Sequence, residues 1–173
     1  MRKKIFAFLL LSALYAGAQE VPDWENPIVV GINKEPYHAT LTLPSQKADC
    51  KEIISLNGKW RFQWSADPGK RPADFYKNDF NTDTWDTIIV PGAWQLQGYG
   101  KPIYSNVNYP FQKDAPKVTS EPPAEYYSYG HRNPTGSYVT TFEVTPDMKD
   151  KCLYLHFEGV KSAMYVWVNG ERV

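Results

Sequence analysis

The chain has 173 residues, of which 42% are hydrophobic, 22% charged and 15% aromatic. That length allows one domain, or one domain with a tail, and the composition excludes a wholly disordered chain. The 19 basic residues balance the 19 acidic ones, so no excess of positive charge is available to bind phosphates. We therefore predict no nucleic-acid partner.

Residues 1–18 have the three-part pattern of a secretory signal peptide. Basic residues at positions 2–4 precede an apolar run, and residues 16–18 read Ala-Gly-Ala, which fits a cleavage site. The apolar run is shorter than the roughly 20 residues that a membrane span needs. We predict cleavage before Gln19, export to the periplasm or the exterior, and no membrane span.

The two cysteines, Cys50 and Cys152, would meet oxidising conditions in an exported protein. Nothing in the sequence places them close together, so a disulfide and two separate thiols both stay open. The sequence has no Cys-x-x-Cys pair and no cluster of Cys and His, so we predict no metal site in this chain.

Residues 19–52 are predicted to form an extended arm, because prolines interrupt them every several positions. Trp24 lies in this arm within the polar stretch Asp-Trp-Glu-Asn-Pro. A Trp in such a setting either docks into a pocket of another surface or folds back on its own domain. The sequence leaves both alternatives open.

Residues 53–173 are predicted to form a β domain. Trp60, Phe62 and Trp64 alternate with polar residues, which is typical of a half-buried strand with an aromatic face. Asn169-Gly170 is a hairpin turn signal and predicts a returning strand, whose start is all that the sequence contains before Val173. We therefore expect the domain to be incomplete at its C-terminal end. Further strands are expected at residues 88–90, 136–144, 152–157 and 163–168, and a short helix at residues 72–78.

No catalytic group can be named from the residues alone. The chain lacks the Gly-x-Ser-x-Gly nucleophile elbow and a phosphate-binding Gly-rich loop. Carboxylates at Glu121, Glu125 and Glu158 would form a glycosidase pair only if the fold brought two within about 5–9.5 Å. The loop-rich stretch 91–135 is long enough to be functional, and His131 in its Tyr-rich part is a candidate to line a site.

Several motifs in one order resemble a known family. Residues 23–27 read Asp-Trp-Glu-Asn-Pro, residues 56–60 read Leu-Asn-Gly-Lys-Trp, and residues 104–110 read Tyr-Ser-Asn-Val-Asn-Tyr-Pro. The chain resembles the N-terminal part of a bacterial β-galactosidase of glycoside hydrolase family 2. The Leu-Asn-Gly-x-Trp motif is shared with β-glucuronidases and β-mannosidases, whereas the loop motif at 104–110 points to the galactosidases. Matching motifs also stand at residues 90–99, 133–138 and 157–170.

The resemblance implies an all-β, jelly-roll β-sandwich of the galactose-binding-domain-like type, known as the sugar-binding domain. The parent enzyme would hydrolyse terminal β-D-galactosides of an oligosaccharide with retention, using two glutamates of a barrel that lies beyond this chain. Its C-terminal catalytic domains would be partners of this one, and its Mg and Na sites would lie mainly beyond this chain. The arm would contribute to contacts between copies in a homo-oligomer.

The resemblance also assigns a sugar contact within this chain. Asn106 would reach the mouth of the barrel, where its amide offers a donor and an acceptor to sugar hydroxyls, and Val107 would support the same wall. Without the resemblance, Asn106 reads as an Asx-turn cap of a loop flanked by prolines. Two other functions stay open: a stand-alone carbohydrate-binding module without catalysis, and a family 2 β-glucuronidase or β-mannosidase.

Overall fold

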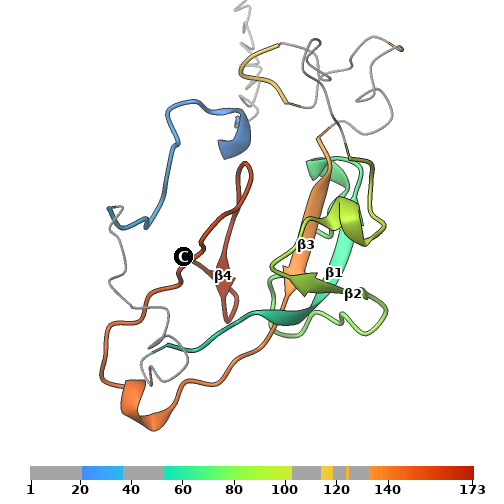
Figure 1. The fold of residues 1–173 in the computed structure, drawn as a ribbon. Coiled ribbons are helices and arrows are strands. Elements are labelled where there is room, and N and C mark those ends of the chain that lie inside the picture. The colour runs from blue at the N-terminus through green and yellow to red at the C-terminus, as the bar shows by residue number, and fades with distance from the viewer. Residues whose placement is uncertain (1–20, 37–52, 103–113, 119–123, 125–132) are drawn as a thin grey trace, which may run out of the picture.

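The computed structural model shows a chain of short strands, turns and single-turn 3-10 helices, so the predicted all-β fold is confirmed (Figure 1). Its described parts form one three-stranded antiparallel sheet, in the order β2-β1-β3, and one two-stranded hairpin, β4-β5. The predicted signal peptide (1–18) lies outside these parts and, like the division of the chain at residues 19 and 53, stays a prediction. The described residues are 21–36, 53–102, 114–118, 124 and 133–173.

The central strand β1 carries the aromatic face that the sequence predicts. Phe62 is fully buried and faces Tyr138 of β3, while the alternate residues Lys59 and Arg61 are exposed. Ile88 of β2, which is 1% exposed, lies opposite Trp60. Phe62 and Ile88 therefore form a buried apolar cluster on one face of this sheet. The strand bounds are Gly58–Ser65 for β1, Asp86–Val90 for β2 and Thr135–Val139 for β3.

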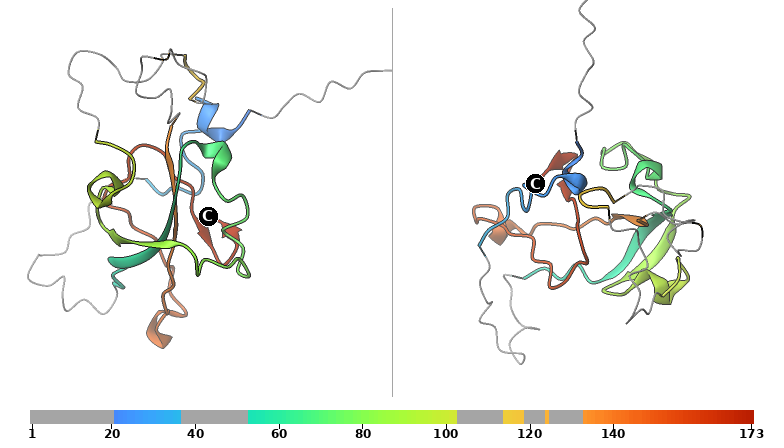
Figure 2. Two further views of the ribbon diagram at one scale, coloured as in Figure 1. Left: turned by 90° about the vertical axis from the view of Figure 1, so that its right-hand side faces the viewer. Right: turned by 90° about the horizontal axis from the view of Figure 1, so that it is seen from above.

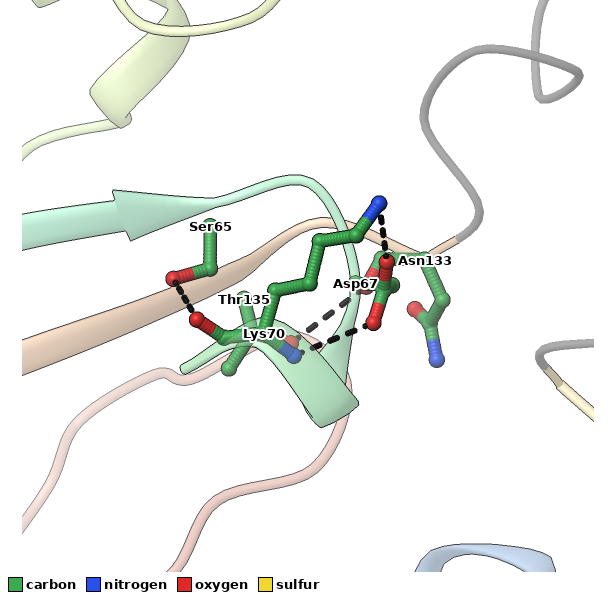
Figure 3. A network of polar contacts seen from close by, with 5 residues as sticks. All are labelled: Ser65, Asp67, Lys70, Asn133 and Thr135. Carbon is green, nitrogen blue, oxygen red and sulfur yellow. Dashed lines mark hydrogen bonds and ion pairs between the residues drawn. The ribbon is translucent and has the colours of Figure 1, made fainter. Parts of the chain in front are cut away.

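A small polar network ends β1 and starts the turn that follows it (Figure 3). The Asp67 side chain accepts a hydrogen bond from the backbone N–H of Lys70 at 3.1 Å and forms an ion pair with the Lys70 ammonium. The hydroxyl of Ser65 donates to the Lys70 carbonyl at 3.4 Å. These contacts cap the 3-10 helix η2 (Pro68–Lys70) and fix the direction in which the chain leaves the sheet.

The predicted hairpin at the C-terminal end is confirmed. Strands β4 (Trp167–Val168) and β5 (Glu171–Arg172) pair in antiparallel register across the Asn-Gly turn. Asn169 and Gly170 have φ values of 51° and 88°, as a tight type I′ turn requires at both central positions. The same dipeptide therefore predicted both the turn and its conformation.

Two other predictions are wrong, and two predicted strands are too long. Residues 72–78 form turns rather than a helix, with backbone bonds such as Lys77 N–H to Asp74 C=O that span only three residues. Residues 152–157 form no strand, and the expected strands at 136–144 and 163–168 shorten to β3 and β4. An apolar strand pattern becomes a strand only when another strand pairs with it, and no described residues pair with 152–157.

The N-terminal arm folds back over the hairpin. Its 3-10 helix η1 (Asp23–Glu25) lies beside the hairpin, as Figure 2 shows. The guanidinium of Arg71, next to η2, is centred 5.2 Å from the Trp24 ring. Two more single turns, η3 (Trp94–Gln97) and η5 (Pro146–Met148), complete the described elements.

Candidate functional site

The three site residues named from the sequence, Asn106, Val107 and His131, lie outside the described residues. Their roles therefore stay predictions. The structure does describe the residues that precede the loop carrying Asn106, up to Pro102. We call residues 92–100, which lead into that loop, the anchor segment.

Aromatic packing holds the anchor segment against the sheet. Trp94 and Tyr99 both contact the buried Phe62, with ring centroids 6.1 and 4.7 Å from it. Tyr138 packs on the same ring at 4.7 Å. Gly136 makes this packing feasible, because a Cβ at that position would lie 2.6 Å from the Trp94 ring and 2.7 Å from Phe62.

Polar contacts tie the anchor segment to strand β2. The side-chain amide of Gln97 accepts a hydrogen bond from the Ile89 N–H at 2.8 Å and donates one to the Ile89 carbonyl at 3.0 Å. Two residues later, the Tyr99 hydroxyl donates to the Asp86 carboxylate at 2.9 Å. Burial, helped by this bond to a carboxylate, raises the pKa of the Tyr99 hydroxyl and keeps it protonated as a donor.

A second group of contacts joins the arm to the hairpin. Arg172 donates to the Asp23 carboxylate at 2.7 Å and also stacks over the ring of Tyr165. The Trp24 ring meets Tyr165 edge-on, with centroids 6.1 Å apart. Of the two alternatives for Trp24, the structure shows the second: the arm folds back on its own domain.

The arm also contacts a residue that follows the segment 103–113 in the sequence. The carboxylate of Glu25 accepts a hydrogen bond from the backbone N–H of Val118 at 3.1 Å. Residues on both sides of the segment 103–113 are thus tied to described elements: the anchor segment to β2, and Val118 to η1.

A column of aromatic rings continues from the arm into the body of the domain. Tyr165 and Trp167 stack at 6.0 Å, and Trp167 stacks on Tyr76 at 5.2 Å with planes 13° apart. Phe75 then connects Trp167 to the buried Trp85. These rings pack on one another and so connect the arm to the buried part of the domain.

The remaining candidate groups give no second site. Within the described ranges, no three His, Cys, Asp or Glu side chains are grouped so that they could hold a metal ion. Glu121 and Glu125 lie outside the described residues, and Glu158 is exposed. Cys152 is exposed and forms no disulfide here, while Cys50 lies outside the described residues. None of the helices in the described part of the chain is long and apolar enough to cross a membrane.

Sequence reasoning missed the residues that hold the anchor segment. A glutamine or tyrosine in a proline-rich loop reads as a solvated side chain, and nothing near Gln97 or Tyr99 predicts the backbone and carboxylate that they bind. Gly136 carried one weak signal, because a glycine inside a strand pattern often marks a close approach of other groups.

Comparison with known proteins places this chain in a family. Residues 53–173 match the family described as "Glycosyl hydrolases family 2, sugar binding domain". A β-galactosidase of Priestia megaterium is 40% identical over 168 residues, which is 91% of this chain and 16% of that protein. A β-galactosidase of Halalkalibacterium halodurans is 38% identical over 84% of this chain and 14% of its own length. A β-galactosidase large subunit of Lactobacillus acidophilus is 41% identical over 69% of this chain and 20% of its own length.

The all-β fold and the match over residues 53–173 define a sugar-binding domain of the glycoside hydrolase type. The chain belongs to glycosyl hydrolase family 2. It spans 14–20% of the length of these relatives.

Proposed function

We propose that this chain is the sugar-binding N-terminal domain of an exported β-galactosidase that hydrolyses terminal β-D-galactosides with retention. The observation that carries the proposal is the similarity to β-galactosidases across 91% of the chain. The loop sequence at residues 104–110 favours the galactosidases over the glucuronidases and mannosidases. A retaining mechanism needs two carboxyl groups about 5–5.5 Å apart, and we place both in the longer protein beyond this chain.

Within that enzyme, Asn106 is proposed to bind a galactose hydroxyl, with Val107 beside it and His131 as a weaker contact. An amide suits this role because it both donates and accepts hydrogen bonds, as sugar hydroxyls do. The anchor segment supports the proposal from the described side: it fixes the chain to β2 only a few residues before the loop begins.

The test is steady-state kinetics of Asn106→Ala in the longer protein, with Asn108→Ala as a matched control in the same loop. Loss of one hydrogen bond to the sugar costs about 1 kcal/mol or more, so kcat/KM should fall at least about fivefold. The control should stay within about twofold. If Asn106→Ala also stays within twofold, the sugar contact is wrong.

A stand-alone carbohydrate-binding module is the second candidate, favoured by the sugar-binding description of the matched family. The intact mass of the protein from its native source distinguishes the two. A mass several times that of this chain supports the enzyme. A mature mass that corresponds to residues 19–173 supports the module.

Export is proposed from the signal-peptide pattern at residues 1–18. N-terminal sequencing of the protein from the periplasmic fraction or the medium should start at Gln19. Recovery of the uncleaved Met1 terminus from the cytoplasm would contradict export.

We also propose that the arm contributes to contacts between copies. Residues 23–25 are engaged within the chain, but the next part of the arm presents Ile28 and Val30, which are 87% and 89% exposed. Two strongly exposed apolar side chains two positions apart offer a surface for a second copy to cover. Replacing both with Ser should shift the mass found by light scattering toward the monomer, and an unchanged mass would contradict the proposal.

A further inference from the structure

Gln97 binds strand β2 as a neighbouring strand would. In the sheet order β2-β1-β3, one side of β2 pairs with β1, and among the residues that the structure describes the other side is an edge. The Gln97 amide accepts from the N–H of Ile89 and donates to the C=O of the same residue, at 2.8 and 3.0 Å. A single side chain therefore satisfies both backbone groups that one edge residue presents.

The chain makes room for this contact. A Cβ on Gly92 would lie 2.7 Å from the Gln97 amide nitrogen and 3.0 Å from the Ile89 carbonyl oxygen. Any larger residue at position 92 would displace the amide from β2, because the Ile89 carbonyl belongs to a paired strand and cannot move freely. Gly92 and Gln97 thus form one unit, which we call the edge clamp.

The edge clamp is the most directional of the contacts in the anchor segment. Ring packing of Trp94 and Tyr99 on Phe62 holds the segment against the sheet but allows sliding, because apolar contact is not directional. Two hydrogen bonds to one backbone unit fix position and rotation together. The clamp therefore sets the register of the anchor segment along β2.

We propose that Gln97 is a positioning residue for the sugar site, acting through the edge clamp on the loop that carries Asn106. This inference rests on the proposed sugar contact of Asn106. Asn106 follows Gln97 by nine positions, so a shift where the segment is anchored alters the path on which the loop starts. A misplacement of about 1 Å at a binding group can cost as much as a hundredfold in rate.

The test compares Gln97→Met with Gln95→Met in the longer protein. Methionine keeps the length and approximate volume of the side chain but removes both hydrogen bonds. Gln95 lies in the same turn η3, and among the described residues the structure gives its side chain no hydrogen bond. We expect kcat/KM for a chromogenic β-galactoside to fall about tenfold in Gln97→Met and to stay within twofold in Gln95→Met.

The decisive readout is the double variant with Asn106→Ala. If Gln97 acts through Asn106, adding Gln97→Met to Asn106→Ala lowers kcat/KM by less than about twofold more. Multiplicative losses would show that Gln97 acts elsewhere or only on stability, and would overturn the inference. A Gln97→Met enzyme with unchanged kcat/KM would also overturn the inference. If Asn106→Ala leaves kcat/KM unchanged while Gln97→Met lowers it, the proposed sugar contact of Asn106 is wrong.

Gly92→Ala provides a second variant that leaves Gln97 in place. It should reproduce the Gln97→Met loss, and Gly92→Ala with Gln97→Met should be no worse than either alone, because both disrupt the same clamp. If Gly92→Ala has full activity and an unchanged melting temperature, the amide is not held by the geometry described, and the inference fails.

Discussion

Residues 58–65 and residues 152–157 have similar strand-like sequences but different structures. In β1 the apolar residues are covered on one face, and Phe62 is fully buried. In the second segment, Leu153 is 53% exposed and Phe157 is 36% exposed, and no regular structure forms. The difference lies in pairing, because β1 has a partner on each side and the described residues give residues 152–157 none.

The comparison shows that burial in these two segments follows strand pairing rather than hydrophobicity alone. Both segments offer apolar side chains, but only β1 has neighbouring strands that bring other apolar groups, such as Ile88 and Tyr138, against it. Apolar burial stabilises a strand when the backbone hydrogen bonds are satisfied at the same time.

Substitutions at two glycines test this comparison and should have the largest effect on stability. Gly136→Ala places a methyl group 2.6–2.7 Å from the Trp94 and Phe62 rings, whereas Gly159→Ala meets nothing within 4 Å. Overpacking should cost Gly136→Ala about 1–3 kcal/mol of unfolding free energy, and Gly159→Ala should change it by less than about 0.5 kcal/mol. Thermal denaturation with hydrogen exchange at β1 measures both. Equal effects would contradict the packing described around Phe62.

Trp24 tests whether side-chain contacts alone hold a segment that lacks strand pairing. Trp24→Ala removes the edge contact with Tyr165 and the stacking of Arg71, together worth about 1–2 kcal/mol. Amide exchange in residues 21–30 should accelerate roughly 5- to 30-fold. The matched control Tyr154→Ala removes an aromatic side chain that is 69% exposed and lies outside the arm, and it should leave exchange unchanged. Slow exchange in both variants would show that other contacts hold the arm.

A rise to alkaline pH should have the smallest effect on the free energy of unfolding. At neutral pH we expect no such effect. Burial raises the pKa of the Tyr138 hydroxyl in β3, and it also raises the pKa of Tyr99 and Tyr165. The folded chain then keeps protons that the unfolded chain loses near pH 10, so stability is full below pH 10 and falls as pH rises above it. Urea unfolding from pH 8 to 11 measures the slope, which Tyr138→Phe should reduce. A free energy of unfolding that rises over this pH range would contradict the raised pKa of these tyrosines.

The sequence predicted those parts of the fold whose signals are local. Alternating aromatics specified β1, and Asn169-Gly170 specified the hairpin and its left-handed turn. It overestimated the strands at residues 136–144 and 152–157 because alternation reports a capacity for pairing and says nothing about the partner. Pairing is a property of distant segments, so the local pattern was insufficient.

The candidate site was less predictable for a similar reason. The resemblance named Asn106 and Val107, but no local pattern marks Gln97 or Tyr99, whose partners Ile89 and Asp86 belong to another element. For Trp24 the sequence allowed two outcomes, because the deciding groups lie at Arg71 and Tyr165. Side-chain contacts between elements become visible only when the fold brings those elements together.

The bond between Asp23 and Arg172 joins residues 149 positions apart, whereas Arg61 of β1 and Trp85, which precedes β2, are separated by 24. Ribosomes add about 5–20 residues per second, so the partner of Asp23 is made roughly 7 to 30 s after it. Throughout that interval Asp23 lacks its ion-pair partner, although Arg71 and Val118, which the arm also contacts, are already made. The docking of the arm on the hairpin can therefore only be completed after synthesis of β5.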